Sequence, residues 1–170
     1  MAPPDRTALV VVDVQRAFED AAYWGRRNNP ACEANVARLI AAWREADAPI
    51  VFVRHDSDEE VSPLRPDHPG NAFKPEVTGE PDLAAWLRGE DLDGIAICGI
   101  TTNHCCETTA RVGANVGFDV LFVLDATHTF DREGPDGTVM TADELARATA
   151  TSLHGEFAQV VDTADVIGSR

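Results

Sequence analysis

Lysine is almost absent from this chain, and basic residues as a whole are few. Of 170 residues, 14 are basic and 29 are acidic, so the formal net charge is −15, and Lys74 is the one lysine. Proteins that bind nucleic acid or an anionic membrane use a basic stripe to displace counterions, and this sequence contains none. We therefore expect no nucleic acid and no membrane among its partners.

Long apolar runs are absent too. No stretch approaches the roughly 20 apolar residues of a membrane span, and the first five residues have neither the basic nor the apolar region of a signal peptide. We expect a cytoplasmic protein. The length and the 44% hydrophobic content fit one globular domain over residues 1–170.

The four cysteines form no C-x-x-C pair and no Cys/His pattern that would close a zinc site. In a reducing compartment they should be free thiols. Cys32 falls on a predicted helix and Cys98 in a predicted strand, where a thiol packs as a small apolar group. The cysteine pattern thus predicts no zinc site.

Apolar runs alternate with segments of helical period along the whole chain. The runs predict strands at residues 8–14, 49–54, 95–98, 119–124 and 159–161, and the helical period predicts helices at 31–46, 82–88, 103–116 and 141–154. This order predicts a three-layer α/β/α, Rossmann-like fold with a mostly parallel sheet of five strands.

Two residues at strand ends suggest a catalytic site. Asp13 ends the first strand, and Cys105 lies in the first turn of the helix after the third. Helix N-termini favour anions, so we expect the pKa of Cys105 to lie below the usual value of about 8.5. If the third strand lies beside the first, opposite the second, the two side chains face each other across a crevice. Asp13 could then activate a nucleophilic Cys105, and backbone N–H groups of the turn at 101–105 could stabilise an oxyanion.

Aromatic and polar residues gather in the loops beside these strand ends. The loop at 18–30 could line a pocket, or equally cover the edge of the core. A second loop at 125–137 also follows a strand end. We expect substrate contacts from five residues, namely Phe18, Trp24, Thr102, His104 and Phe130.

The motifs D-V-Q at 13–15 and G-I-T-T-N-H-C-C-E-T-T-A-R at 99–111 resemble those of the isochorismatase-like cysteine hydrolases. The resemblance covers nearly the whole chain. The stretches at 23–30 and 153–157 are similar to a bacterial branch that includes streptothricin hydrolase-like amidases. The resemblance implies a thioester on Cys105, with Asp13 as base and acid. It further implies a cis peptide before Thr101, an oxyanion hole from the amides of Thr101 and Cys105, no cofactor, and a homodimer or larger oligomer.

The sequence departs from the family at its third catalytic residue, a lysine at the end of an edge strand in a pattern like T-K-x-x-x-S-A-F. That pattern is absent, as if the segment had been removed between residues 78 and 86, which leaves five predicted strands where the family has six. Lys74 is either a replacement cation or a solvated lysine. The Asp-x-His pair of metal-binding members is also absent: Arg54-His55-Asp56 stands there, so we expect no metal and a hydrogen-bonded loop role for His55.

Three functions follow from these observations. The first is a cofactor-free cysteine hydrolase that cleaves the C–N bond of a small amide. The second is a catalytically weakened or inactive relative that serves as a binding or assembly protein, because the lysine segment is missing. The third is thiol redox work by Cys105 and Cys106, which a vicinal pair does poorly since its disulfide is strained.

Overall fold

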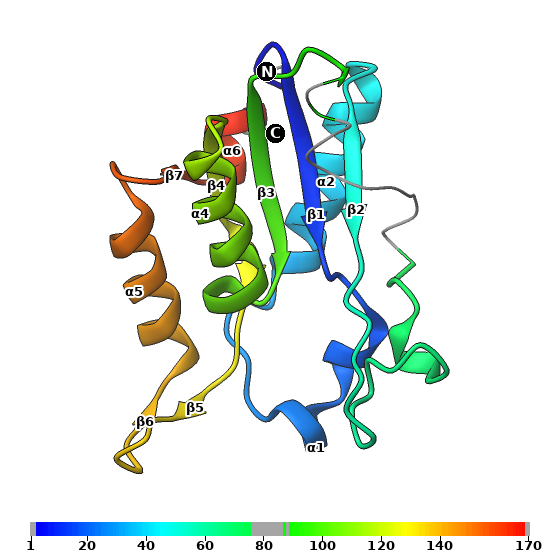
Figure 1. Cartoon of the computed structure of the whole chain (residues 1–170), viewed down its shortest axis with the longest axis vertical. Coiled ribbons are helices and arrows are strands. Elements are labelled where there is room, and N and C mark those ends of the chain that lie inside the picture. The colour runs from blue at the N-terminus through cyan, green and yellow to red at the C-terminus, as the bar shows by residue number, and fades with distance from the viewer. Residues whose placement is uncertain (1–2, 76–86, 88, 169–170) are drawn as a thin grey trace.

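The structure, a computed structural model, describes residues 3–75, 87 and 89–168 (Figure 1). Its main sheet has five strands in the order β2-β1-β3-β4-β7, and every neighbouring pair is parallel. The strands are β1 (Thr7–Val12), β2 (Ile50–Val53), β3 (Gly94–Ile100), β4 (Asp119–His128) and β7 (Gln159–Val161). The predicted fold class and the position of the third strand beside the first are both confirmed.

Strand β1 is buried on both faces, as its unbroken apolar run predicts. Leu9 and Val11 pack with helix α2 (Cys32–Glu45), while Val10 and Val12 pack on the opposite side. Figure 1 shows α4 (Glu107–Asn115) and α5 (Ala142–Leu153) in front of the sheet and α2 behind it. The core therefore lies in two layers around one sheet.

The helices form where their apolar positions and caps predict. Helix α2 buries the predicted stripe, and the indole N–H of Trp43 donates to the carbonyl of Thr7 at 3.0 Å. Helix α5 begins at a capping box formed by Thr141 and Glu144. Short elements complete the described chain: η1 (Arg16–Glu19), α1 (Ala21–Trp24), η2 (Pro69–Asn71) and α6 (Thr163–Ile167).

Three regions differ from the sequence-based expectation. Strand β4 runs on to His128 instead of ending at residue 124, because Thr127 and His128 pair with β3. A small antiparallel hairpin begins in the predicted loop at 125–137 with β5 (Arg132–Glu133) and ends just beyond it with β6 (Val139–Met140). The predicted helix at 82–88 lies almost entirely outside the described residues. Within the described residues, no helix is both long enough and apolar enough to cross a bilayer.

Gly99 lets β1 and β3 approach closely where they lead into the crevice. Its φ is +129°, and a Cβ built there would lie 2.0 Å from the carbonyl oxygen of Val12. Both the backbone conformation and the space therefore require glycine. The residue after Val12 is Asp13, so this contact lies directly before the turn at Asp13.

Replacing Gly99 with alanine should lower the free energy of unfolding by about 3 kcal/mol or more, since overpacking and a strained φ add to one another. Urea denaturation would measure the change. Gly137→Ala is the matched control, because Gly137 has a φ of +78° with no atom within 4 Å of its Cβ position. The control should lose about 1 kcal/mol, and equal losses in the two variants would show that the contact with Val12 is unimportant.

Candidate active site

The carboxyl ends of β1 and β3 meet at the point where the strand order reverses, since β1 lies between β2 and β3. After β1 the chain turns at Asp13, whose φ of 50° is unusual for a residue other than glycine. After β3 it enters η3 (Thr102–Cys106), a single π-helical stretch that continues into α4. These two turns place the side chains of Asp13 and Cys105 in one crevice.

The side chains of Asp13 and Cys105 lie close enough for each to shift the pKa of the other. The carboxyl group of Asp13 is buried, with 2% of the residue exposed, whereas the Cys105 thiol is half-buried. The other three cysteines are buried. One oxygen of Asp13, Oδ1, has no hydrogen-bond partner among the described residues. The structure therefore brings together the predicted nucleophile and base, with the thiol on the open side.

The pKa values of Asp13 and Cys105 differ from those that the sequence predicts. Burial raises the pKa of Asp13 to about 6, although the hydrogen bond from Cys105 and the charge of His55 act in the opposite direction. Burial and the negative charge of Asp13 raise the pKa of Cys105 to about 12. The expectation of an ionised Cys105 is therefore wrong: burial and the adjacent carboxylate outweigh the helix N-terminus. At neutral pH the pair is therefore a neutral thiol beside a carboxylate.

The backbone next to the Cys105 sulfur also affects its thiol. The backbone of Thr101 and of Cys105 lowers the pKa of this thiol, by less than burial raises it. The peptide bond between Ile100 and Thr101 is cis. Thr101 and Cys105 are the two residues whose amides the resemblance implies for an oxyanion hole.

The predicted substrate residues lie in three different environments. Phe18, Trp24 and Phe130 form an aromatic cluster, with ring centroids 4.9 Å apart for Phe18 and Trp24 and 5.4 Å apart for Trp24 and Phe130. His104 is exposed at the surface, yet partial loss of hydration of its ring and then the positive charge of Arg132 lower its pKa. Thr102 is fully buried and its hydroxyl donates to the hydroxyl of Thr127 at 2.9 Å, so that hydroxyl joins η3 to β4.

Strand β4 contains a bulge next to the end of β3, which leads into the crevice. Phe122 pairs with Ile97 but Thr127 pairs with Gly99, so extra residues of β4 loop out between these pairs. Asp125 lies in this bulge, and its Oδ1 accepts hydrogen bonds from both the backbone N–H and the hydroxyl of Thr163, each at 2.7 Å. The bulge is thus tied to the first residue of α6.

Lys74 does not pair with Asp13. Its ammonium group lies 2.6 Å from a carboxylate oxygen of Glu33 and 3.9 Å from one of Glu19, and no ion pair among the described residues joins it to Asp13. Lys74 is also 3% exposed, so it is not the solvated lysine considered as its other role. The place of the missing family segment, residues 78–86, lies outside the described residues.

Gln15 and Glu33 are the residues that sequence reasoning missed. The buried Gln15 side chain accepts from the N–H of His55 at 2.9 Å and donates to its carbonyl at 3.0 Å, which holds the chain after β2 beside Asp13. Gln15 was visible as the third residue of D-V-Q. Glu33 gave no signal, because a glutamate in the first turn of a helix is ordinary.

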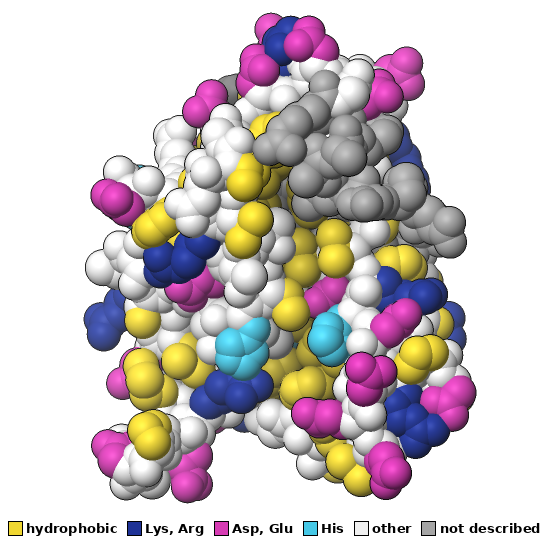
Figure 2. All heavy atoms as spheres, in the orientation of Figure 1, with side chains coloured by type: hydrophobic (Ala, Val, Ile, Leu, Met, Phe, Trp, Pro, Cys, Tyr) yellow, Lys and Arg dark blue, Asp and Glu magenta, His cyan; other side chains and the backbone are white. Residues whose placement is uncertain are grey.

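On the face drawn in Figure 2, apolar side chains gather between two histidines near the middle of the molecule. Among the described residues, no group of three or more His, Cys, Asp or Glu side chains is arranged to hold a metal ion. The chemistry available in the crevice is therefore that of a thiol, a carboxylate and backbone N–H groups.

Known proteins resemble the chain in sequence and in fold. The family model of the isochorismatase domain matches residues 7–165. The isochorismatase family protein YrdC of Bacillus subtilis (strain 168) is 32% identical over 180 residues, covering 96% of this chain and 95% of YrdC. Nicotinamidase 3 of Arabidopsis thaliana is 29% identical over 184 residues, covering 91% and 84%. A crystal structure of an isochorismatase-family protein from Chromobacterium violaceum ATCC 12472 is 34% identical, with a TM-score of 0.90 over 98% of this chain and 96% of that one. The finer placement in a streptothricin hydrolase-like branch stays a prediction.

Proposed function

Because this chain belongs to the isochorismatase family, we propose that it is a cysteine hydrolase that cleaves the amide C–N bond of a small molecule through a thioester on Cys105. The observation that carries the proposal is the proximity of the Asp13 carboxylate and the Cys105 thiol, which shift each other's pKa, beyond the ends of two neighbouring parallel strands. The similarity to a nicotinamidase supports an amide as the substrate. The aromatic cluster of Phe18, Trp24 and Phe130 supports a small, partly apolar one.

In the first half of the reaction, the Cys105 sulfur attacks the carbonyl carbon while Asp13 accepts the thiol proton. The carbonyl oxygen becomes an anion that accepts hydrogen bonds from the Thr101 and Cys105 amides. Asp13 then donates its proton to the nitrogen, the C–N bond breaks, and the amine leaves. In the second half, Asp13 accepts a proton from water, the oxygen attacks the thioester carbon, and the sulfur regains a proton as the acid departs.

A second function, that of a binding or assembly protein with little activity, is supported by the electrostatics of the pair. The described residues give Asp13 no lysine or arginine partner, and the pKa of Cys105 is about 12. A thiol with that pKa is not ionised at neutral pH, so its attack on a carbonyl carbon depends entirely on transfer of its proton to Asp13. If that transfer is slow, the crevice still binds an amide but turns it over poorly.

Incubation with nicotinamide, a carbamoyl compound and a lactam in separate reactions distinguishes the two functions. We expect release of the acid from at least one of them and an acyl adduct on Cys105, because this is the one half-exposed thiol. Intact-protein mass spectrometry after acid quenching would detect the adduct. Cys106→Ala is the control that should keep it. Saturable binding of an amide without adduct or product would favour the binding protein.

A further inference from the structure

The carboxylate of Asp13 is buried without a cation in direct contact. Only 2% of the residue is exposed, and its Oδ1 has no hydrogen-bond partner within the described part of the chain. None of the ion pairs found there includes Asp13. Burying a carboxylate without a paired charge costs free energy. A positive charge near the crevice would therefore stabilise the form of Asp13 that accepts the thiol proton.

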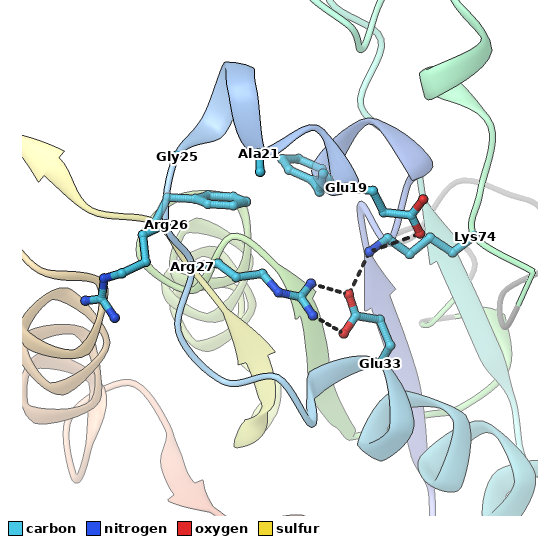
Figure 3. Close-up of a pocket in the computed structure, with 9 residues that line it drawn as sticks. Glu19, Ala21, Gly25, Arg26, Arg27, Glu33 and Lys74 are labelled. Atoms are coloured by element: carbon cyan, nitrogen blue, oxygen red, sulfur yellow. Dashed lines mark hydrogen bonds and ion pairs between the residues drawn. The ribbon is translucent and has the colours of Figure 1, made fainter.

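The one lysine of the chain is held elsewhere. Figure 3 shows Lys74 and Arg27 reaching the carboxylate of Glu33 from opposite sides, with Arg26 directed away from it. Arg27 binds both oxygens of Glu33, and Lys74 donates to Oε1 at 2.6 Å. The charges of Lys74 and Arg27 are thus shared with Glu33, and a cation for Asp13 has to come from another part of the fold.

His55 is the residue that the fold brings toward Asp13 from the neighbouring strand. Val12 pairs with Val53 in the parallel register of β1 and β2, and the N–H of Asp13 donates to the carbonyl of Val53 at 2.9 Å. His55 follows this contact by two residues. Burial raises the pKa of Asp13 to about 6, and the charge of His55 lowers it. The end of β2 therefore supplies a basic side chain to the crevice.

Two buried amide side chains fix the backbone of His55. Gln15 Oε1 accepts from the N–H of His55 at 2.9 Å, and Gln15 Nε2 donates to the His55 carbonyl at 3.0 Å. Asn71 Nδ2 donates to the same carbonyl at 3.1 Å, and the carbonyl of Asn71 accepts from Gln15 Nε2 at 2.7 Å. The N–H of Gln15 also donates to the carbonyl of Asp13 at 2.7 Å. One glutamine thus connects the backbone of the proposed base to that of the histidine.

The other charged and titratable groups near this pair have partners or are neutral. Asp56 adjoins His55, but its Oδ1 accepts from Arg54 Nε at 3.1 Å and from an amide side chain at 3.0 Å. On the side of η3, Asp13 faces the thiols of Cys105 and Cys106, whose pKa values burial raises far above neutral pH. Asp13 is therefore the carboxylate near His55 that has no arginine of its own.

We propose that His55 takes the place of a lysine beside Asp13, with Gln15 and Asn71 as positioning residues that hold its backbone so that the imidazolium stabilises the carboxylate. The assignment rests on the proposed hydrolase, in which Asp13 is the base, and adds a partner for that base from the end of β2. It gives His55 an electrostatic role in addition to the hydrogen-bonded loop role expected from the sequence.

Carbon-13 NMR of the full chain, labelled at the aspartate carboxyl carbons, measures the titration of Asp13 directly, and Asp13→Asn identifies its signal. The midpoint should lie at about 6 in the unchanged chain. His55→Gln should raise it by about 0.5 pH unit, because a positive charge is lost whose effect water partly screens. His55→Lys keeps a positive charge, so its midpoint should not exceed that of the unchanged chain. His154→Gln, which removes an exposed histidine after α5, is the matched control and should leave the midpoint unchanged.

Gln15→Met tests the positioning role, because methionine removes the hydrogen bonds to His55 without adding a charge. It should raise the Asp13 midpoint when His55 is present and have little effect together with His55→Gln, since both changes remove the same interaction. Additive shifts would show that Gln15 acts on Asp13 independently of His55 and would overturn its positioning role. If Gln15→Met does not fold, as judged by circular dichroism, the His55 variants still decide.

An unchanged midpoint in His55→Gln would overturn the proposal, as would an equal rise in His55→Lys. The titration requires no turnover, so a chain that releases no acid from any amide would contradict the proposed hydrolase and leave this measurement valid. In an active chain, the decline of the rate at low pH should move upward with the midpoint, so that His55→Gln at pH 6 retains about half of the rate of the unchanged chain.

Discussion

Replacing Cys105 with alanine is expected to lower amide hydrolysis by about 10⁴-fold or more, because the reaction loses the atom that forms the thioester. The residual rate should be that of a binding site without a nucleophile. Steady-state release of acid or ammonia, measured on the amide that the unchanged chain hydrolyses best, gives this ratio directly.

Two observations separate a loss of the nucleophile from a loss of stability. Cys105 is half-buried, so its truncation should change the free energy of unfolding by less than about 1 kcal/mol. The neighbouring Cys106 is fully buried against the sheet, and Cys106→Ala should cost more stability but leave the rate within a few-fold. If Cys106→Ala removed activity and Cys105→Ala did not, the nucleophile would be Cys106 and the proposal would be contradicted.

Replacing Asp13 with asparagine is expected to lower hydrolysis by about 10³-fold while making Cys105 easier to alkylate. Asparagine cannot take the thiol proton, so the general-base step is lost. It also removes the negative charge that raises the pKa of Cys105, so more thiolate should form at pH 9. Asparagine tolerates the φ of 50° found at this position, which makes it a milder change than alanine.

The pH profile provides the second measurement on Asp13. The pKa of Asp13 is about 6, and the carboxylate is the reactive form, so the rate should be steady above pH 7 and fall as the pH decreases through about 6. The low-pH decline should disappear in Asp13→Asn. Iodoacetamide labelling of Cys105, followed by mass spectrometry, completes the comparison. Parallel losses of turnover and labelling would indicate a damaged fold instead of a missing base.

The sequence predicts the position of the crevice because its information there is local. The apolar runs that become β1 and β3 end at Asp13 and just before Thr101, and parallel strands bring their ends to one edge of a sheet. The small residues Ala110 and Gly113 likewise predict the face of α4 that packs on the sheet. A Cβ at Gly113 would lie 2.6 Å from a methyl group of Ile95.

What the sequence could not predict depends on contacts between distant residues. Lys74 and Glu33 are 41 positions apart, and neither has a local pattern that indicates a pair. The pKa of Cys105 depends on burial and on the proximity of Asp13. Of the influences on this pKa, only the position of Cys105 in a helix turn can be read from the sequence. Strand β4 was predicted to end early because Thr127 and His128 are polar, yet both are buried by pairing with β3.

The bond between Asp125 and Thr163 has a practical consequence for protein engineering. Shortening the chain from its carboxyl end past Thr163 would remove two of the donors that hold the carboxylate of Asp125, a residue in the bulge of β4. Affinity tags and fused domains can follow the last turn of α6, but a cut before it should loosen this bulge, which is remote from the cut in sequence.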